Sequence, residues 1–316
     1  MENYFTPENY SSVYNINKFF NKIIIEDHIG GFDNDFRNPI LDHISKSVTE
    51  QTTVMTYYMF NDSVKHNYPN LTFKSDQIYY PRLLQSFQDY NCHPEINFKN
   101  FLCSFNGTNH VSRKLLVSAL QKFRHFNPEY CSKNFVFTSD TLDGHIRDYV
   151  ADNNNFYRKF FIADHSEEFF QTVHSFGHVQ YDHPRNIYNL EHKLTQSFLH
   201  IVSETMATNC HAFISEKSFY SIVTRGLFLS YAQAGWHEYL EKYLGFKRYT
   251  KLFDYTFDAI QNPVERLVEL MTMISKFSIL SPDDWRDLYL IEQDTIEYNY
   301  HHYFSGNYMQ HLKQYG

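Results

Sequence analysis

Several kinds of segment are missing from this sequence of 316 residues, and each absence excludes a class of protein. No uninterrupted apolar run reaches the roughly 18 residues that a membrane-spanning helix requires. The first ten residues, MENYFTPENY, contain neither a basic stretch nor an apolar one, which argues against a secretory signal peptide. Internal repeats and low-complexity segments are absent as well. We therefore expect a globular protein that resides in the cytoplasm and does not associate with membranes.

Cysteine is scarce, and basic residues are outnumbered. The four cysteines, Cys92, Cys103, Cys131 and Cys210, show no Cys-x-x-Cys spacing, which argues against a disulfide framework and against a structural zinc site. The chain has 28 Lys and Arg against 36 Asp and Glu, a formal net charge of -8. Binding to nucleic acid is therefore not indicated by the charge and would need a local basic patch.

Apolar runs alternate with helical patterns along the chain. The runs predict strands at 22–28, 52–60, 76–80, 98–104, 134–138, 158–163, 197–205 and 227–231. Helical spacing and capping residues predict helices at 39–47, 82–90, 112–125, 215–224, 236–244, 263–277 and 282–300. The last two are expected to be capped by Asn262 and Ser281, each followed by a proline at the first helical position. Such alternation is typical of α/β proteins with mostly parallel sheets. A loop rich in His, Asn and Pro is expected at 174–189.

The alternation runs in two successive series, which predicts two Rossmann-like domains facing a cleft. A length of 316 residues also fits about two domains at roughly 150 residues each. We place a first α/β domain at 1–97 and a second at 98–280. The remaining helical segment, 281–316, could pack back on the first domain.

The densest group of polar residues lies within 199–246. Glu204 ends an apolar strand and is expected to point into a crevice at the strand's carboxyl end, because burying a carboxylate inside a sheet is costly. Ser215 can cap the next helix, with Glu216 and Lys217 in its first turn. A lysine at a helix N-terminus suits a phosphate, and a nearby carboxylate suits hydroxyl groups. The alternative is an ordinary solvated helix start.

These residues resemble a known family. An apolar strand ending in Glu, an aromatic-x-Ser/Thr-Glu-Lys helix start and a Leu-Gly-Phe that closes a later helix resemble the α-1,3-fucosyltransferase type of glycosyltransferase and its shorter relatives in phages and large viruses. That family reads Phe-Glu-Asn and Tyr-x-Thr-Glu-Lys, where this chain reads SET at 203–205 and FISEK at 213–217. Thr205 stands in place of the Asn, and Phe213 in place of a Tyr whose hydroxyl contacts the donor. The resemblance covers roughly residues 99–278.

The resemblance implies a GT-B arrangement, in which the second domain binds a sugar nucleotide and the first binds the acceptor. It implies an inverting transfer that uses neither a catalytic metal nor a cofactor, with a GDP-linked donor by analogy. An Arg that follows the first strand of the second domain corresponds to Arg113, which would face the donor diphosphate. The residues implied to bind the donor are Arg113, Glu204, Thr205, Phe213, Ser215, Glu216 and Lys217.

The catalytic base should come from the first domain. Glu26, Asp27 and His28 follow the first strand, and Gly30 and Gly31 open the loop behind them. A carboxylate or imidazole at that place could accept the proton of an acceptor hydroxyl.

The sequence Asp-Asn-Asp at 33–35 could instead be the metal-binding Asp-x-Asp of the other glycosyltransferase architecture, although such a triplet is more often a turn.

Taken together, the sequence predicts an inverting glycosyltransferase that moves a sugar from a nucleotide-diphosphate donor to a hydroxyl acceptor such as a glycan. Two alternatives stay open. One is a viral glycosyltransferase that modifies DNA bases, which a basic stripe across the first domain would favour. The other is a non-catalytic module that binds a sugar or nucleotide and has lost its activity, which the changes at Thr205 and Phe213 would favour.

Overall fold

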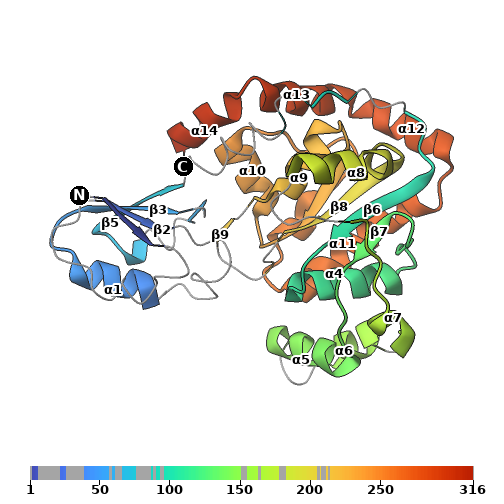
Figure 1. Cartoon of the computed structure of the whole chain (residues 1–316), viewed down its shortest axis with the longest axis horizontal. Helices are drawn as coiled ribbons and strands as arrows, with labels where there is room; N and C mark the ends of the chain where they lie inside the picture. Colours follow the sequence, from blue (N-terminus) through green and yellow to red (C-terminus); the bar gives the residue numbers. More distant parts are fainter. Residues whose placement is uncertain are drawn as a thin grey trace.

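The computed structural model of this chain shows an α/β protein (Figure 1). The structure describes residues 2–5, 22–25, 39–56, 59–60, 66–75, 87, 90–92, 96–150, 155–162, 165–177, 183–204, 207, 211–212 and 214–315.

A parallel sheet of four strands forms the centre of the larger part of the molecule. Its strands are β6 (Asn100–Asn106), β7 (Cys131–Lys133), β8 (Ser197–Ser203) and β10 (Leu227–Tyr231), in the order β10-β8-β6-β7. All three neighbouring pairs are parallel. After β6, the chain first forms β7 on one side of β6 and later forms β8 on the other side of β6. The gap between the carboxyl ends of β6 and β8 is therefore the topological switch point, where open α/β sheets bind ligands.

Helices cover both faces of this sheet. The helices α8 (His183–Thr195) and α9 (Glu216–Val223) lie on one side, and α4 (Val111–Lys122) and α11 (Pro263–Ser278) lie on the other (Figure 1). This double cover explains why β8 and β10 are buried along their whole length and consist mostly of apolar residues. Within the described residues, no helix is both long and apolar enough to cross a membrane.

The loop between β10 and α11 contains the helix α10 (Trp236–Leu244) and the 3-10 turn η2 (Tyr255–Ala259). Three further helices, α5 (Ser139–Tyr149), α6 (Asn155–Ile162) and α7 (Glu167–Gln171), lie between β7 and α8.

A second parallel sheet is built from the first part of the chain. It has the order β1-β2-β3-β5, with β1 (Glu2–Phe5), β2 (Lys22–Ile25), β3 (Thr52–Thr56) and β5 (Leu71–Ser75). The helix α1 (Pro39–Ser47) connects β2 to β3. A short antiparallel pair, β4 (Met59–Phe60) with β9 (His211–Ala212), joins this part of the chain to the segment after β8.

The C-terminal helices α12 (Pro282–Ile291), α13 (Gln293–Phe304) and α14 (Asn307–Tyr315) arch over the larger sheet (Figure 1). Tyr303 and Tyr308 stack with ring centroids 5.5 Å apart, and both contact Phe219 of α9. Asn91, which belongs to the first 97 residues, accepts a hydrogen bond from Tyr300 at 3.3 Å. This C-terminal segment therefore packs mainly on α9 and α10 and also touches the end of the N-terminal segment.

Four sequence predictions of local structure were wrong. Residues 158–163 were expected to form a strand and instead belong to α6, because a short apolar run does not by itself distinguish a strand from a buried helix. The strand expected at 134–138 is β7, three residues earlier. The loop expected at 174–189 ends where α8 begins at His183. The helix expected at 282–300 is divided at Glu292, which ends α12 and precedes α13.

Other predictions are confirmed. Asn262 caps α11 and Ser281 caps α12, each followed by a proline at the first helical position. The strands predicted at 98–104, 197–205 and 227–231 are present as β6, β8 and β10, with small differences at their ends. Residues 76–80 lie outside the described part of the chain.

Candidate functional site

The candidate site lies at the switch point of the larger sheet, where the loop after β6 approaches the segment after β8. Ser112 of α4 donates its hydroxyl hydrogen bond to the backbone carbonyl of Glu204 at 3.2 Å, which links the two segments across 92 residues of sequence. The N-termini of α4 and α9 both start from this edge. The sheet thus brings together residues that the sequence analysis placed in separate motifs.

Glu204 holds the N-terminus of α9 in place. One of its carboxylate oxygens accepts the backbone N–H of Ser215 at 3.0 Å, and the other accepts the hydroxyl of Ser218 at 2.8 Å. The side chain is fully buried, which differs from the expected carboxylate open to a crevice, because α9 supplies donors for both oxygens. Burial raises the pKa of Glu204, and the charge of Lys217 with the hydrogen bonds from the two serines opposes that rise.

The first turn of α9 has the predicted form. Ser215 is the N-cap, and its side chain accepts the backbone N–H of Lys217 at 3.4 Å. The Nζ of Lys217 lies 2.7 Å from a carboxylate oxygen of Glu216, and the two side chains are 16% and 13% exposed. Lys217 therefore faces the site with a carboxylate partner already beside it.

Arg113 extends from the first turn of α4 and is almost fully buried, with 2% of its surface exposed. Its Nη1 donates to the carbonyl of Thr108 at 3.4 Å, and its Nε has no hydrogen-bond partner among the described residues. Burial lowers the pKa of this guanidinium, while the charges of Glu216 and Glu204 raise it. A buried donor without a partner is costly, so the Nε of Arg113 is a candidate to bind an acceptor that is not among the described residues.

Three further groups lie around the same helix end. Lys114 is 8% exposed, and its ammonium donates to the Nε2 of His145 at 3.3 Å. His110 is the N-cap residue of α4, but its imidazole makes no capping hydrogen bond. Burial, followed by the charges of Arg113, Lys217 and Lys114, lowers the pKa of His110 to about 4. We call His110, Arg113, Lys114 and Lys217 the cationic cluster.

The charge of the site is positive although the whole chain is negative. Arg113, Lys114 and Lys217 contribute three positive charges, and Glu204 with Glu216 contributes at most two negative ones, so the sum is +1 or more. His110 is neutral near pH 7, because burial and neighbouring positive charges lower its pKa to about 4. Burial and the charge of Lys114 lower the pKa of His145, and the charge of Asp148 opposes this. Positive charges, the N–H groups of a helix N-terminus and a donor without a partner together suit an anion such as a phosphate.

The structure brings together five of the residues predicted to bind the donor, namely Arg113, Glu204, Ser215, Glu216 and Lys217. Thr205 and Phe213 lie outside the described residues, as do Glu26, Asp27, His28 and the 33–35 triplet. The sequence analysis missed His110, Lys114 and His145. The Asn-His before an uncapped helix start was a weak signal for His110, and no local pattern indicated that α5 would carry His145 to Lys114.

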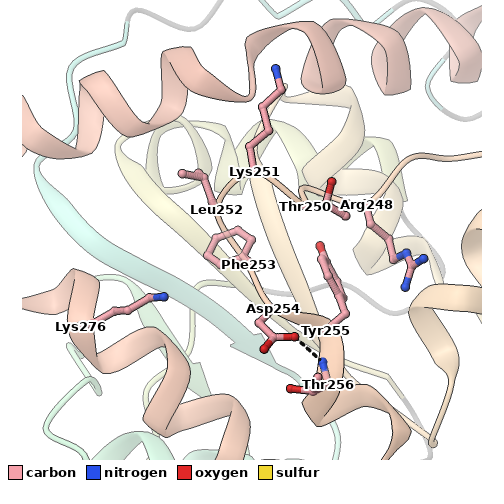
Figure 2. Close-up of a pocket in the computed structure, with 9 residues that line it drawn as sticks. All are labelled: Arg248, Thr250, Lys251, Leu252, Phe253, Asp254, Tyr255, Thr256 and Lys276. Atoms are coloured by element: carbon pink, nitrogen blue, oxygen red, sulfur yellow. Dashed lines mark hydrogen bonds between the residues drawn. The ribbon is translucent and has the colours of Figure 1, made fainter.

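An open pocket of about 620 Å³ shares no lining residue with the cationic cluster (Figure 2). It is lined by Arg248, Thr250, Lys251, Leu252, Phe253, Asp254, Tyr255, Thr256 and Lys276. Arg248 is paired with Glu241 at 2.8 Å, and Lys251 donates to the carbonyl of Ile291 at 2.9 Å. None of the residues that line this pocket carries a buried polar atom without a partner, so the pocket is a weaker candidate for an anion than the cationic cluster.

A buried His–Asp pair resembles a catalytic pair but cannot act as one in this geometry. The Nδ1 of His237 lies 2.8 Å from Asp258, and its Nε2 accepts the backbone N–H of Ser230 at 3.0 Å. Both ring nitrogens are thus engaged within the protein, and neither can take a proton from a substrate. Elsewhere in the described part of the chain, no three His, Cys, Asp or Glu side chains gather as metal ligands.

Comparison of this chain with protein family models, with curated proteins and with solved structures gave no match.

Proposed function

We propose that the chain is a glycosyltransferase whose larger sheet binds the diphosphate of a nucleotide-sugar donor at the cationic cluster. The observation that carries the proposal is Arg113, a buried guanidinium at the switch point with an Nε that no described residue satisfies. A guanidinium keeps its charge at any working pH, and its planar donors match phosphate oxygens. This supports a phosphate more directly than it supports any particular base or sugar.

A transferase needs such a group for the leaving diphosphate. As the bond between the anomeric carbon and the donor oxygen breaks, negative charge develops on the phosphate. Fixed cations beside that oxygen stabilise it without a metal, and Arg113 and Lys217 are the groups we assign to this task. To Glu216, next to Lys217, we assign the hydrogen bonds from hydroxyls of the ligand. The transfer is proposed to be inverting, by analogy with the family that the sequence resembles.

We assign Glu204 a positioning role in this proposal. Its oxygens bind the backbone of Ser215 and the hydroxyl of Ser218, so it fixes the helix that carries Lys217. The GT-B arrangement with an acceptor domain at residues 1–97 and a donor domain at 98–280 remains part of the proposal, together with a base among Glu26, Asp27 and His28.

The first experiment is a calorimetric titration with guanosine, GDP, UDP and their sugar conjugates, followed by an assay of donor hydrolysis. Binding of a nucleoside diphosphate at least tenfold tighter than its nucleoside, with release of free sugar, would support a transferase. Binding without any hydrolysis or transfer would favour a non-catalytic nucleotide-binding module. No preference for diphosphates over nucleosides would refute the proposed site.

The base is tested by Ala or Asn substitutions at Glu26, Asp27 and His28. Loss of a general base lowers transfer by about 10²–10⁴-fold, and donor affinity should stay unchanged because the donor is assigned to the other sheet. If all three variants keep near-native transfer, the base lies elsewhere. A fall in donor affinity together with the fall in transfer would contradict the assignment of the donor and the base to different sheets.

A further inference from the structure

The imidazole of His110 lies among positive charges and makes no capping hydrogen bond to α4. It belongs to the N-cap residue of α4, is partly buried, and makes no hydrogen bond to another described residue. The backbone of His110 has a separate role, since its carbonyl accepts the N–H groups of Arg113 and Lys114. The side chain can therefore change its protonation state without breaking a hydrogen bond of the described chain.

The surroundings of His110 come from four elements. Its own helix contributes Arg113 and Lys114, and α9 contributes Lys217, which is paired with Glu216. Glu204, at the end of β8, accepts the backbone N–H of Ser215 at the start of α9. His145 of α5 contacts Lys114, and the charge of Asp148, on the same helix, raises the pKa of His145. Burial and the three cations favour the neutral imidazole, whose pKa is about 4. In the protein without ligand, His110 is therefore a neutral imidazole surrounded by positively charged side chains.

A bound anion reverses this balance. One negative charge about 4 Å from the imidazole raises its pKa by roughly three units at the effective dielectric constant of a protein surface. A dianion also exceeds the local charge of +1, so a further proton brings the site back to neutrality. The N–H groups at the start of α4 and the buried Nε of Arg113, which has no partner among the described residues, are donors for such an anion.

We propose that the cationic cluster binds a dianion together with one proton from solvent, and that His110 takes up this proton and becomes the fourth positive donor of the site. This inference rests on the proposed function in placing a phosphate at the cluster. It adds that the site prefers ligands with two negative charges over those with one, and that its affinity rises as the pH falls.

The test is calorimetry with sodium sulfate, a dianion that does not titrate between pH 5 and 8, in buffers of different ionisation enthalpy. We expect uptake of about one proton per sulfate near pH 6, and up to a tenfold gain in affinity per pH unit between pH 7 and pH 5. The His110→Asn variant should show neither effect. His145→Asn is the matched control, because it removes a nearby imidazole that contacts Lys114, and it should keep the proton uptake.

If sulfate binds, any of three results would overturn the inference: binding without proton uptake, uptake that persists in His110→Asn, or uptake that is lost in His145→Asn alone. An NMR titration of the His110 ring provides an independent readout, since its pKa should rise by several units when sulfate is added. Thermal unfolding of His110→Asn checks that the variant folds. Failure to bind sulfate at all would also count against the inference.

Parallel titrations with GDP-mannose, whose phosphates do not titrate in this range, separate this inference from the proposed function. Proton-coupled sulfate binding without any binding of nucleotide sugars would leave the role of His110 in place and refute the donor site. Nucleotide-sugar binding without proton uptake would support the donor site and refute the role of His110.

Discussion

Replacing Lys217 by Ala should weaken the binding of a diphosphate far more than the binding of a nucleoside. A charge-assisted hydrogen bond to phosphate contributes about 1.5–3 kcal/mol, which corresponds to a loss of roughly 10–150-fold in affinity. The structure places the expected loss at the upper end of this range. Lys217 lies 2.7 Å from the carboxylate of Glu216, so its removal leaves an unpaired negative charge facing the incoming phosphate.

The assay is calorimetry with inorganic pyrophosphate, GDP and guanosine, so that the phosphate contribution is measured with and without a base. A Glu216→Gln/Lys217→Ala double variant removes the unpaired carboxylate and should recover part of the lost pyrophosphate affinity. Lys99→Ala is the matched control, because Lys99 is an exposed lysine next to the opposite, amino end of β6. Equal losses for GDP and guanosine, or an equal loss in Lys99→Ala, would refute the phosphate role of Lys217.

Three further predictions concern stability and metal dependence. Gly226→Ala should lower the free energy of unfolding by about 1–3 kcal/mol in urea titrations, because its Cβ would lie 2.1 Å from the Cε1 of His200. Gly144→Ala is the control: Gly144 lies in a helix, its added Cβ would meet nothing within 4 Å, and the variant should not be destabilised. The free energy of unfolding should fall as the pH drops from 6.5 toward 4. Burial lowers the pKa of His200 to about 4, so in this range the unfolded chain binds a proton that the folded chain does not. The resulting loss of stability is at most about 3 kcal/mol. A pH slope that is unchanged in His200→Asn would contradict this cause. Transfer activity should survive exhaustive chelation, and a complete loss that manganese restores would redirect attention to the Asp-Asn-Asp triplet at 33–35.

The features that the sequence determined by itself are local ones. Ser215, Asn262 and Ser281 were identified as helix caps because a cap bonds to the backbone two or three residues along the chain. The strands β6, β8 and β10 were predicted correctly because each is a short, mostly apolar run bounded by polar turns, a pattern contained within the segment itself. The strand prediction at 158–163 was wrong because these six residues fit either a strand or a buried helix, and packing against their neighbours decided between the two.

What the tertiary structure decided is which side chains share the switch point and what charge they carry there. Arg113 and Glu204 are 91 residues apart in the sequence, and the order β10-β8-β6-β7 places their segments side by side. Glu204 is buried rather than open because α9 folds over it and donates to both its oxygens. The neutral state of His110 depends on charges from α4 and α9 at once, and electrostatic effects of this kind act through distances in space that a sequence does not contain.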